Sequence, residues 1–464
     1  MTFLVTNIPY AQWLNPGDNS WQLVSATLVG LMSIPALAVL YGGLVQKKWI
    51  VNTMLMVFMG FSLTLIVWML YGYNMAFGPQ AHLGATGSFW SGFVGVPHPL
   101  LSHFAEQNQA VSGANTLVPF HFPTATFSYF QFAFAAITPL LFLGGLLGRL
   151  KFKAWLLIVP LWITFVYCIN AALVWGGGFF AQKGAVDYAG GYVIHLSAGV
   201  ASFVGAAILG PRLKRDRTTV PSNMMMVAIG AGILWMGWNG FNGGATYYAG
   251  ADASSAVLNT NVATAVGVVT WVVMDMLFSK SKKPAFLGAI NGMLCGLVAI
   301  TPSAGWVNGL GAILVGFIAS SVVWVSWNYL SRIRPFSRVD DSLGVVYTHG
   351  IAGLIGGLLV GVLADPGMTT YGVTGKDFNA AGSFSVGGWF YTHSFHQLWE
   401  QFLTAVWVIS FTAVATAVIF YFVKFVLGGL REDDNTLEVG DLAIHDEEAF
   451  PTETFAERVS SLSR

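Results

Sequence analysis

The stretch that decides the fold is residues 192–210, which read YVIHLSAGVASFVGAAILG and carry His195. A second stretch, residues 345–363, reads VVYTHGIAGLIGGLLVGVL and carries His349. Both stretches are apolar and long enough to lie within a lipid bilayer. An ionisable side chain there is costly, and by default it indicates a functional site.

The two histidines also share their local sequence, because each begins the pattern His-x-x-Ala-Gly. Positions i+3, i+4 and i+7 share the face of position i on a helix, and here they hold only Ala, Gly and Ser. Small residues on one face let membrane helices pack closely. We therefore expect the two imidazoles to meet across a thin interface. The alternative is two unrelated structural histidines, each bonded to a backbone carbonyl, and the repeated context disfavours it.

Composition places the chain in a membrane. Of its 464 residues, 55% are hydrophobic and 9% are charged, whereas soluble domains carry about 25% charged residues. The formal net charge is zero, so no nucleic acid or other polyanionic partner is expected. Cys168 and Cys295 lie in apolar segments and are interpreted as small core residues. We expect no cofactor and no enzymatic activity.

Hydropathy predicts an all-α integral membrane protein with eleven transmembrane helices. The expected spans are residues 21–45, 50–77, 126–148, 154–177, 190–210, 222–245, 256–278, 285–302, 307–330, 343–364 and 398–427. This alternation puts 19 of the 21 Lys and Arg residues on one side, all except Lys183 and Lys376. The positive-inside rule then places the N-terminus outside and the C-terminus in the cytoplasm. No Lys or Arg precedes the first span, so no cleavable signal is expected.

The spans form a five-plus-five inverted repeat followed by a final helix. Because five is odd, the second set is inserted upside down, and a substrate path is expected at the repeat interface near the midplane. His195 lies in the fifth span and His349 in the tenth. The membrane domain covers residues 1–430 and includes a long outer loop at about 79–125, for which a lid or an interface is favoured over a metal site. That loop carries His82, His98, His103 and His121.

The chain after residue 430 has a different composition. Residues 431–464 hold ten of the 21 acidic residues and show no apolar periodicity. We interpret them as an acidic, solvated cytoplasmic tail.

Several other residues have side chains suited to binding a cation, capping a helix or closing a pore. Trp175 lies near the outer end of the fourth span, and the face of its indole can bind a cation. A tryptophan of the aromatic belt at the membrane interface is the simpler interpretation. Asp187 precedes the fifth span; a helix cap is favoured over cation attraction. Phe134 lies one helical turn after Phe130, and Phe241 sits in a glycine-rich break. Rings stacked over a pore would form a hydrophobic gate, whereas taken alone they fill a core.

In several stretches the chain resembles the ammonium transporter (Amt/Mep/Rh) family. The stretches are LYGGLVQKK, YGYNMAFG, FQFAFAAIT, VWGGGFFAQKGAVDYAGGYVIHLSAG, WMGWNGFNGGA, NTNVATA, TPSAGW, RVDD and YTHGIAGLIGG, in the family's order over about residues 20–430.

This resemblance implies a homotrimer with one pore per subunit in the cell membrane, either plasma or bacterial inner membrane. It implies that His195 and His349 line the pore and that Phe134 and Phe241 form the gate. An outer substrate-binding site is implied at Trp175, Phe130 and Ala245, with Asp187 structural beside it.

Three positions depart from the family pattern. Bacterial members often have a serine at the position of Ala245, so a high-affinity outer site is less expected here. An acidic residue often found before the second histidine is Gly344. The tail reads EVGDLAIHDEEAF instead of a Gly-Leu-Asp segment followed by His-Gly-Glu, which weakens the expectation of a PII-type signal protein as partner.

The mechanism expected from these residues is deprotonation followed by conduction of ammonia. Burial disfavours imidazolium, so both histidines should be neutral and should pass ammonia, while potassium has no proton to lose. Whether the proton follows is left open. The rival hypotheses are an electroneutral Rh-like gas channel, an ammonium sensor that signals through the tail, and a metalloenzyme, which would need a third ligand.

Overall fold

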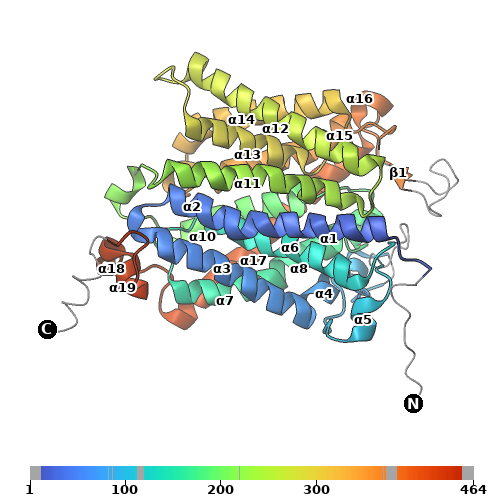
Figure 1. Ribbon diagram of the computed structural model, residues 1–464, viewed down its shortest axis with the longest axis horizontal. Helices are drawn as coiled ribbons and strands as arrows, with labels where there is room; N and C mark the ends of the chain where they lie inside the picture. The colour runs from blue at the N-terminus through green and yellow to red at the C-terminus, as the bar shows by residue number, and fades with distance from the viewer. Residues whose placement is uncertain are drawn as a thin grey trace.

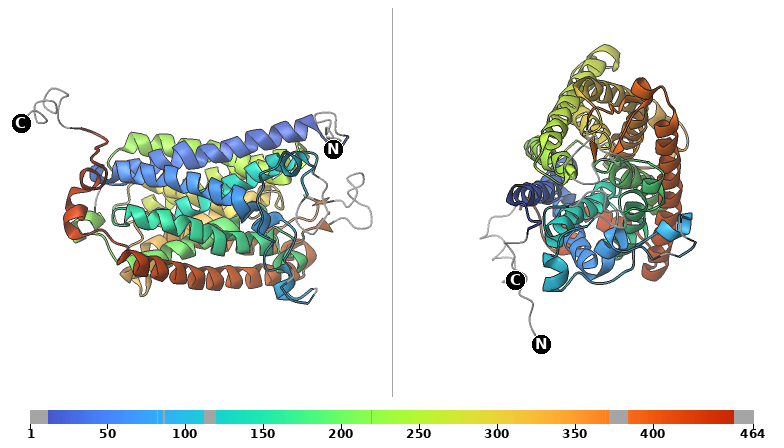
Figure 2. Two further views of the ribbon diagram at one scale, coloured as in Figure 1. Left: turned by 90° about the horizontal axis from the view of Figure 1, so that it is seen from below. Right: turned by 90° about the vertical axis from the view of Figure 1, so that its right-hand side faces the viewer.

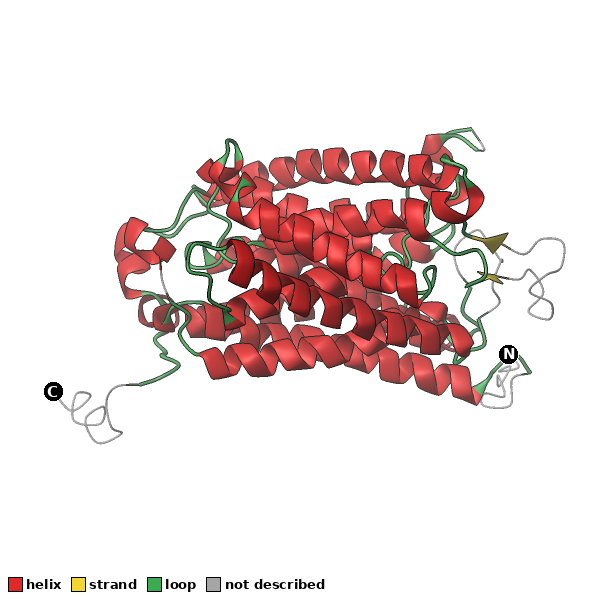
Figure 3. Ribbon diagram, turned by 90° about the horizontal axis from the view of Figure 1, so that it is seen from above, coloured by secondary structure: helices red, strands yellow, loops and turns green. Residues whose placement is uncertain are grey.

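The computed structural model describes residues 12–81, 83–85, 87–111, 120–218, 220–368, 370–371 and 384–451. Long helices run roughly side by side along one axis, and connecting loops gather at the two ends (Figure 1, Figure 3). Viewed along that axis, the peripheral helices of the bundle enclose a central group of helices (Figure 2). The start of α1 and the helices α18 and α19 lie at opposite ends of the bundle (Figure 1).

The first half of the chain forms five helical segments. They consist of α1 (Pro16–Leu31), η1 (Met32–Leu37) and α2 (Ala38–Leu44); η2 (Lys47–Trp49), α3 (Ile50–Val67), η3 (Trp68–Gly72) and α4 (Tyr73–Phe77); α6 (Thr124–Leu143); α7 (Phe152–Trp162), η5 (Ile163–Tyr167), α8 (Cys168–Val174) and α9 (Phe179–Gln182); and η6 (Gly191–Leu196) with α10 (Ser197–Leu209).

The second half repeats this plan and adds a final helix. Its segments are α11 (Met224–Gly243) with η8 (Gly244–Thr246), α12 (Ala251–Phe278), α13 (Phe286–Ile300), α14 (Gly309–Asn328), η11 (Val346–Ile351) with α15 (Ala352–Leu363), and the final α17 (His396–Leu427).

Short elements complete the fold. They are η4 (Phe89–Gly92), α5 (His103–Gln107), η7 (Lys214–Thr218), η9 (Leu330–Arg332), η10 (Phe336–Arg338), α16 (Trp389–Thr392), α18 (Asp434–Val439), α19 (Asp441–His445), and the antiparallel strands β1 (Thr370–Tyr371) and β2 (Phe384–Ser385).

Ten helical segments in the described ranges have the length and composition needed to cross a membrane. The expected span at 285–302 is a shorter helix, α13, with 15 residues. A helix of that length rises about 22 Å, less than the roughly 30 Å of a bilayer core. The chain continues from α13 into buried turns at residues 301–306. The all-helical prediction is confirmed apart from the two-residue strands β1 and β2.

The two histidine-bearing helices pack as closely as the sequence predicted. A Cβ added at Gly199 would overlap the backbone of Gly350 on the opposite helix. A Cβ added at Gly353 would lie 2.6 Å from the Gly191 carbonyl oxygen and 3.1 Å from Cβ of His195. Because no side chain separates the two backbones, the interface is thin enough for side chains on either helix to meet.

The beginning of the tail contacts the helical bundle through a few buried residues, whereas most residues of 431–445 are exposed or partly exposed. Leu437 is fully buried, and Asp441 accepts hydrogen bonds from the backbone N–H groups of Val51 and Asn52, at 2.8 and 2.9 Å, at the start of α3. His445 Nε2 lies 2.9 Å from Oδ1 of Asn52. Residues 452–464 lie outside the described residues.

The outer loop makes its own contacts within the described ranges. His121 Nδ1 lies 3.3 Å from Oδ2 of Asp18 at the start of α1, and the backbone carbonyl of His98 accepts a hydrogen bond of 2.8 Å from Asn74. His82 is outside the described residues, as is the side chain of His103. No group of three His, Cys, Asp or Glu side chains suited to a metal ion occurs in the described ranges.

Candidate functional site

His195 and His349 meet inside the bundle. Their Nδ1 atoms are 3.2 Å apart, and the ring centroids lie 5.3 Å apart with the planes inclined by 22°. The two side chains are 0% and 5% exposed. A hydrogen bond between two neutral imidazoles needs one Nδ1–H donor and one Nδ1 acceptor, so the rings hold opposite tautomers. Their Nε2 atoms then offer one acceptor and one donor.

The ring of His195 is held by aromatic neighbours and keeps a free nitrogen. Its Nε2 is buried without a hydrogen-bond partner among the described residues. Trp238 stacks on the ring at 5.3 Å between centroids and 18° between planes, and the Trp238 indole N–H donates to Thr301 at 2.9 Å. Trp238 was not among the predicted site residues. The available signal was its position three residues before Phe241 on the same helical face.

Each histidine follows an aspartate that caps its helix. Asp187 accepts backbone N–H bonds from Gly190, Gly191, Tyr192 and Val193, at 2.6 to 3.0 Å. Asp341 accepts from the Val346 N–H at 2.8 Å and from the Ser202 hydroxyl at 3.3 Å. Burial raises the pKa of both carboxyls, and the N–H bonds oppose that rise.

The predicted cap at Asp187 is therefore confirmed, and Asp341 is its counterpart in the second half. Sequence reasoning missed Asp341. The signal was available, because each aspartate lies eight residues before its histidine (195 − 187 = 349 − 341 = 8).

A continuous series of aromatic rings leads from Trp175, at the end of α8, to the histidines. Trp175 contacts Phe134 edge-on at 6.2 Å, and Phe130 lies 4.6 Å from Phe134. Phe134 and Phe241 stack at 4.2 Å with 27° between their planes, and Phe241 lies 5.9 Å from His195. The structure thus brings five of the predicted residues into one column with His349 at its end.

The outer end of this column is built differently from a serine-containing site. Ala245 is 2% exposed, and it follows Gly244, where an added Cβ would lie 2.5 Å from the Phe130 ring. Hydroxyls of other residues lie nearby: an added Cβ at Gly244 would lie 2.7 Å from Cβ of Ser25, whose buried hydroxyl has no hydrogen-bond partner among the described residues. The Tyr247 ring lies 6.1 Å from Phe130, and its OH accepts a 3.0 Å hydrogen bond from Gln131. The Trp175 N–H is already used, since it donates to the Asp187 carbonyl at 2.6 Å. The polar N–H edge of the indole therefore points to the loop that carries Asp187, and the face of the ring is the part that can bind a cation.

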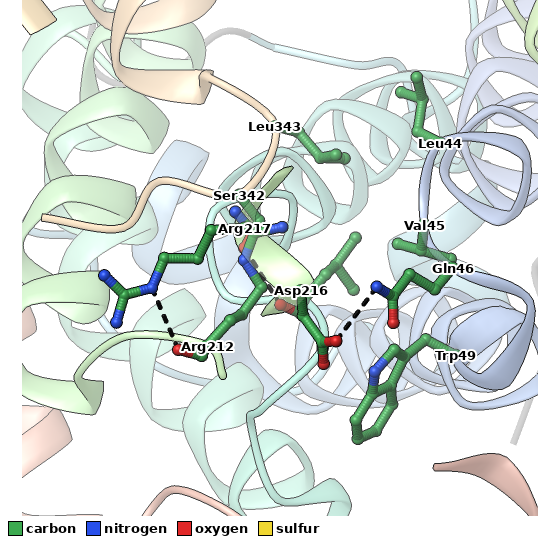
Figure 4. Close-up of a pocket in the computed structure, with 11 residues that line it drawn as sticks. Leu44, Val45, Gln46, Trp49, Arg212, Asp216, Arg217, Ser342 and Leu343 are labelled. Atoms are coloured by element: carbon green, nitrogen blue, oxygen red, sulfur yellow. Dashed lines mark hydrogen bonds between the residues drawn. The ribbon is translucent and has the colours of Figure 1, made fainter. Parts of the chain in front are cut away.

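At the other end of the bundle, a cavity of about 100 Å³ lies among the ends of the helical segments (Figure 4). Its lining includes Gln46, Asp216 and Arg217, together with Ser342 in the segment before His349. Arg212, also in the lining, makes a 2.7 Å salt bridge to Asp340. Burial acts to raise the pKa of Asp340, but the hydrogen bonds and charge of Arg212 outweigh it and lower the pKa to about 2.

Comparison with known proteins agrees with this architecture. The sequence model described as Ammonium Transporter Family matches residues 20–450. The chain is 43% identical over 454 residues to Ammonium transporter 3 member 2 of Oryza sativa subsp. japonica, covering 96% of this chain and 92% of that protein. It is 42% identical over 442 residues to Ammonium transporter 2 of Arabidopsis thaliana, covering 95% and 89%.

A solved structure has the same fold. The crystal structure of Saccharomyces cerevisiae Mep2 matches with a TM-score of 0.76 and 27% identity, covering 91% of this chain and 89% of that one. With its apolar crossing helices, the chain is a multi-pass membrane protein, consistent with the plasma membrane. The family model covers nearly the whole chain, and the protein belongs to the ammonium transporter family.

Proposed function

We propose that this protein recruits ammonium at the outer end of the aromatic column, removes a proton below the Phe134 and Phe241 rings, where an unprotonated imidazole nitrogen of the histidine pair accepts it, and conducts ammonia past the paired histidines. The observation that carries the proposal is the 3.2 Å contact between Nδ1 of His195 and Nδ1 of His349, below the stacked rings of Phe134 and Phe241. A neutral imidazole pair offers both a donor and an acceptor to a small polar molecule. A potassium ion finds no compensating charge beside these rings.

The outer site in this proposal consists of Trp175, Phe130 and Ala245. A cation at the Trp175 face would be held by the ring quadrupole, a contribution of about 1 to 2 kcal/mol. Asp187 keeps the indole and the helix of His195 in place through the contacts described above. The stacked Phe134 and Phe241 rings form a hydrophobic gate between this outer site and the histidines, below which the substrate loses its proton.

The membrane arrangement in this proposal has eleven crossings, with α13 as the shortest, the N-terminus outside and the C-terminus in the cytoplasm. The distribution of Lys and Arg supports that orientation. A homotrimer with one pore per subunit is the assembly proposed from the family. A PII-type signal protein at the tail is the proposed partner, and a pull-down with the purified transporter tests it.

Reconstitution tests the function. Proteoliposomes holding the wild-type protein should accumulate ammonium after an inward concentration jump, whereas empty liposomes should not. A current evoked by the same jump would show that the proton follows the ammonia, and uptake without current would favour the electroneutral Rh-like channel. Absence of ammonium uptake under all these conditions would contradict the proposal.

A second candidate function, an ammonium sensor, is favoured by how the tail is attached. Lys48 Nζ donates to the Leu437 carbonyl in α18 at 2.7 Å and lies 3.1 Å from Asp216 Oδ2, and Asp216 lines the inner cavity. The Lys48 side chain thus contacts both the tail and the rim of the cavity. A strain whose protein ends at residue 430 and still takes up ammonium, but has lost a nitrogen response, would support the sensor.

A further inference from the structure

The final helix α17 lies outside the five-plus-five repeat but touches both of its halves. It packs against α10 of the first half and α15 of the second, the helices that follow the two histidines. It runs along one side of the bundle (Figure 2). Gln401 lies in its second turn and is fully buried, although glutamine is mostly found on protein surfaces.

The amide of Gln401 uses both its oxygen and its nitrogen. Its Oε1 accepts the Val186 N–H at 2.9 Å, and its Nε2 donates to the Val186 carbonyl at 2.8 Å. Nε2 also donates to the Gly357 carbonyl in α15 at 3.0 Å. One turn earlier, Gln397 donates to the Gly184 carbonyl at 2.9 Å and to Gln401 at 3.2 Å. The loop before the fifth span is therefore fastened to α17 by side-chain amides.

That loop carries the groups that fix the outer site. Val186 is bonded through both its N–H and its C=O, and the next residue is Asp187. The Asp187 carbonyl holds the Trp175 indole at 2.6 Å, and the Asp187 carboxylate caps the helix of His195. A shift of Val186 would carry Asp187 with it, because trans peptide units are planar and stiff.

We propose that Gln401 is a positioning residue for transport, which acts by holding the loop that orients Trp175 and caps the His195 helix. A neutral amide suits this place because it supplies donor and acceptor together without burying a charge. Hydrophobic contact with α15 and α10 would hold α17 in the bundle without these bonds, so the role of Gln401 is separable from that of the helix. The inference rests on the proposed function, since its readout is ammonium transport.

The test uses Gln401→Met, which keeps the length of the side chain and removes the hydrogen bonds, in the full-length protein in proteoliposomes. Loss of one hydrogen bond corresponds to about a fivefold change in an equilibrium constant, and we expect the displaced loop to pass on to the outer site about the loss of one bond, not of all those that Gln401 makes. We expect the KM for ammonium to rise about fivefold to tenfold, with the maximal rate changed by less than about twofold. The matched control is Thr404→Val, because the buried Thr404 hydroxyl, within the described part of the chain, bonds to the Glu400 carbonyl of its own helix and to no other group.

A double-mutant cycle identifies the route. If Gln401 acts through the Trp175 loop, adding Gln401→Met to Trp175→Leu should raise KM by less than about twofold further, since coupled residues are not additive. Full multiplication of the two effects, or Gln401→Met behaving as Thr404→Val does, would overturn the inference. If Gln401→Met does not elute from a size-exclusion column at the wild-type volume, Gln401→Asn and Gln397→Leu are measured instead, with the same rise in KM expected. Wild-type protein that takes up no ammonium would instead refute the proposed function.

Discussion

Asp187 and Asp341 cap matching helices with different numbers of hydrogen bonds. Asp187 accepts four backbone N–H groups, whereas Asp341 accepts two, from Val345 and Val346, together with the Ser202 hydroxyl. A lost cap costs about 1 kcal/mol, and up to about 2 kcal/mol where several donors are left unpaired. We therefore expect Asp187→Ala to lower the free energy of unfolding by about 2 kcal/mol and Asp341→Ala by about 1 kcal/mol. Thermal unfolding in detergent measures both, with exposed Glu447→Ala as the control; equal losses at the two aspartates would contradict this ranking.

Functional residues that carry a recognisable pattern in their local sequence could be predicted. Residues whose role depends on contacts with distant parts of the chain could not. The repeated His-x-x-Ala-Gly pattern identified His195 and His349, because a costly side chain in the same context twice is informative by itself. Gln401 gave no such signal. Its role depends on Val186, which is 215 residues away in the chain and only 2.9 Å away in space.

The helix α19 docks on the membrane domain through a carboxyl whose charge depends on pH. Burial, opposed by the N–H groups of Asn52 and Val51, raises the pKa of Asp441 to about 6. A released tail would have the ordinary value of about 3.9, so the docked form binds the proton more tightly. The stabilisation of docking by protonation of Asp441 is therefore present at low pH and is lost as the pH rises through about 6. Burial lowers the pKa of His445 in the same helix, so protonation of His445 acts in the opposite direction. That opposing effect is the smaller one, because His445 is only partly buried whereas Asp441 is 1% exposed.

Hydrogen exchange measures this effect. After correction for intrinsic exchange rates, amides of residues 434–445 should be better protected at about pH 5 than at about pH 7.5. Asp441→Asn should remove most of the difference, whereas Glu447→Ala, at an exposed position, should keep it. Equal protection at the two pH values in the wild type would show that docking does not depend on this carboxyl.

Among the elements, hydropathy located the long helices but could not set the length of α13 or the docking of the tail. Residues 285–302 are apolar apart from Asn291 and Thr301, so hydropathy alone does not set the end of the helix at Ile300; the available signal was Pro302, which disfavours helix in the residue before it. The helices α18 and α19 have six and five residues. Segments that short span fewer than two helical turns, which is too few to show an apolar periodicity in the sequence. Their stability comes from the surface onto which they pack.

For the whole molecule, the histidines meet because the two helices that carry them pack against each other. Each half supplies one histidine from its fifth helical segment, and the small residues beside each histidine bring the backbones into contact. The family and the fold could be predicted from the sequence because the motifs are spread along nearly the entire chain. The stacked Phe134 and Phe241 rings needed coordinates, because two phenylalanines out of 35 carry no pairing information.

The central claim is that the paired imidazoles select for a substrate that gives up a proton. The most direct measurement is the ratio of ammonium to potassium flux in proteoliposomes for wild type, His195→Ala, His349→Ala and the double variant. The wild type is expected to exclude potassium, and the double variant is expected to lose most of its preference for ammonium, because the pore then lacks the imidazole groups that accept the proton and hydrogen-bond ammonia. A double variant that still transports ammonium and still excludes potassium as the wild type does would contradict it.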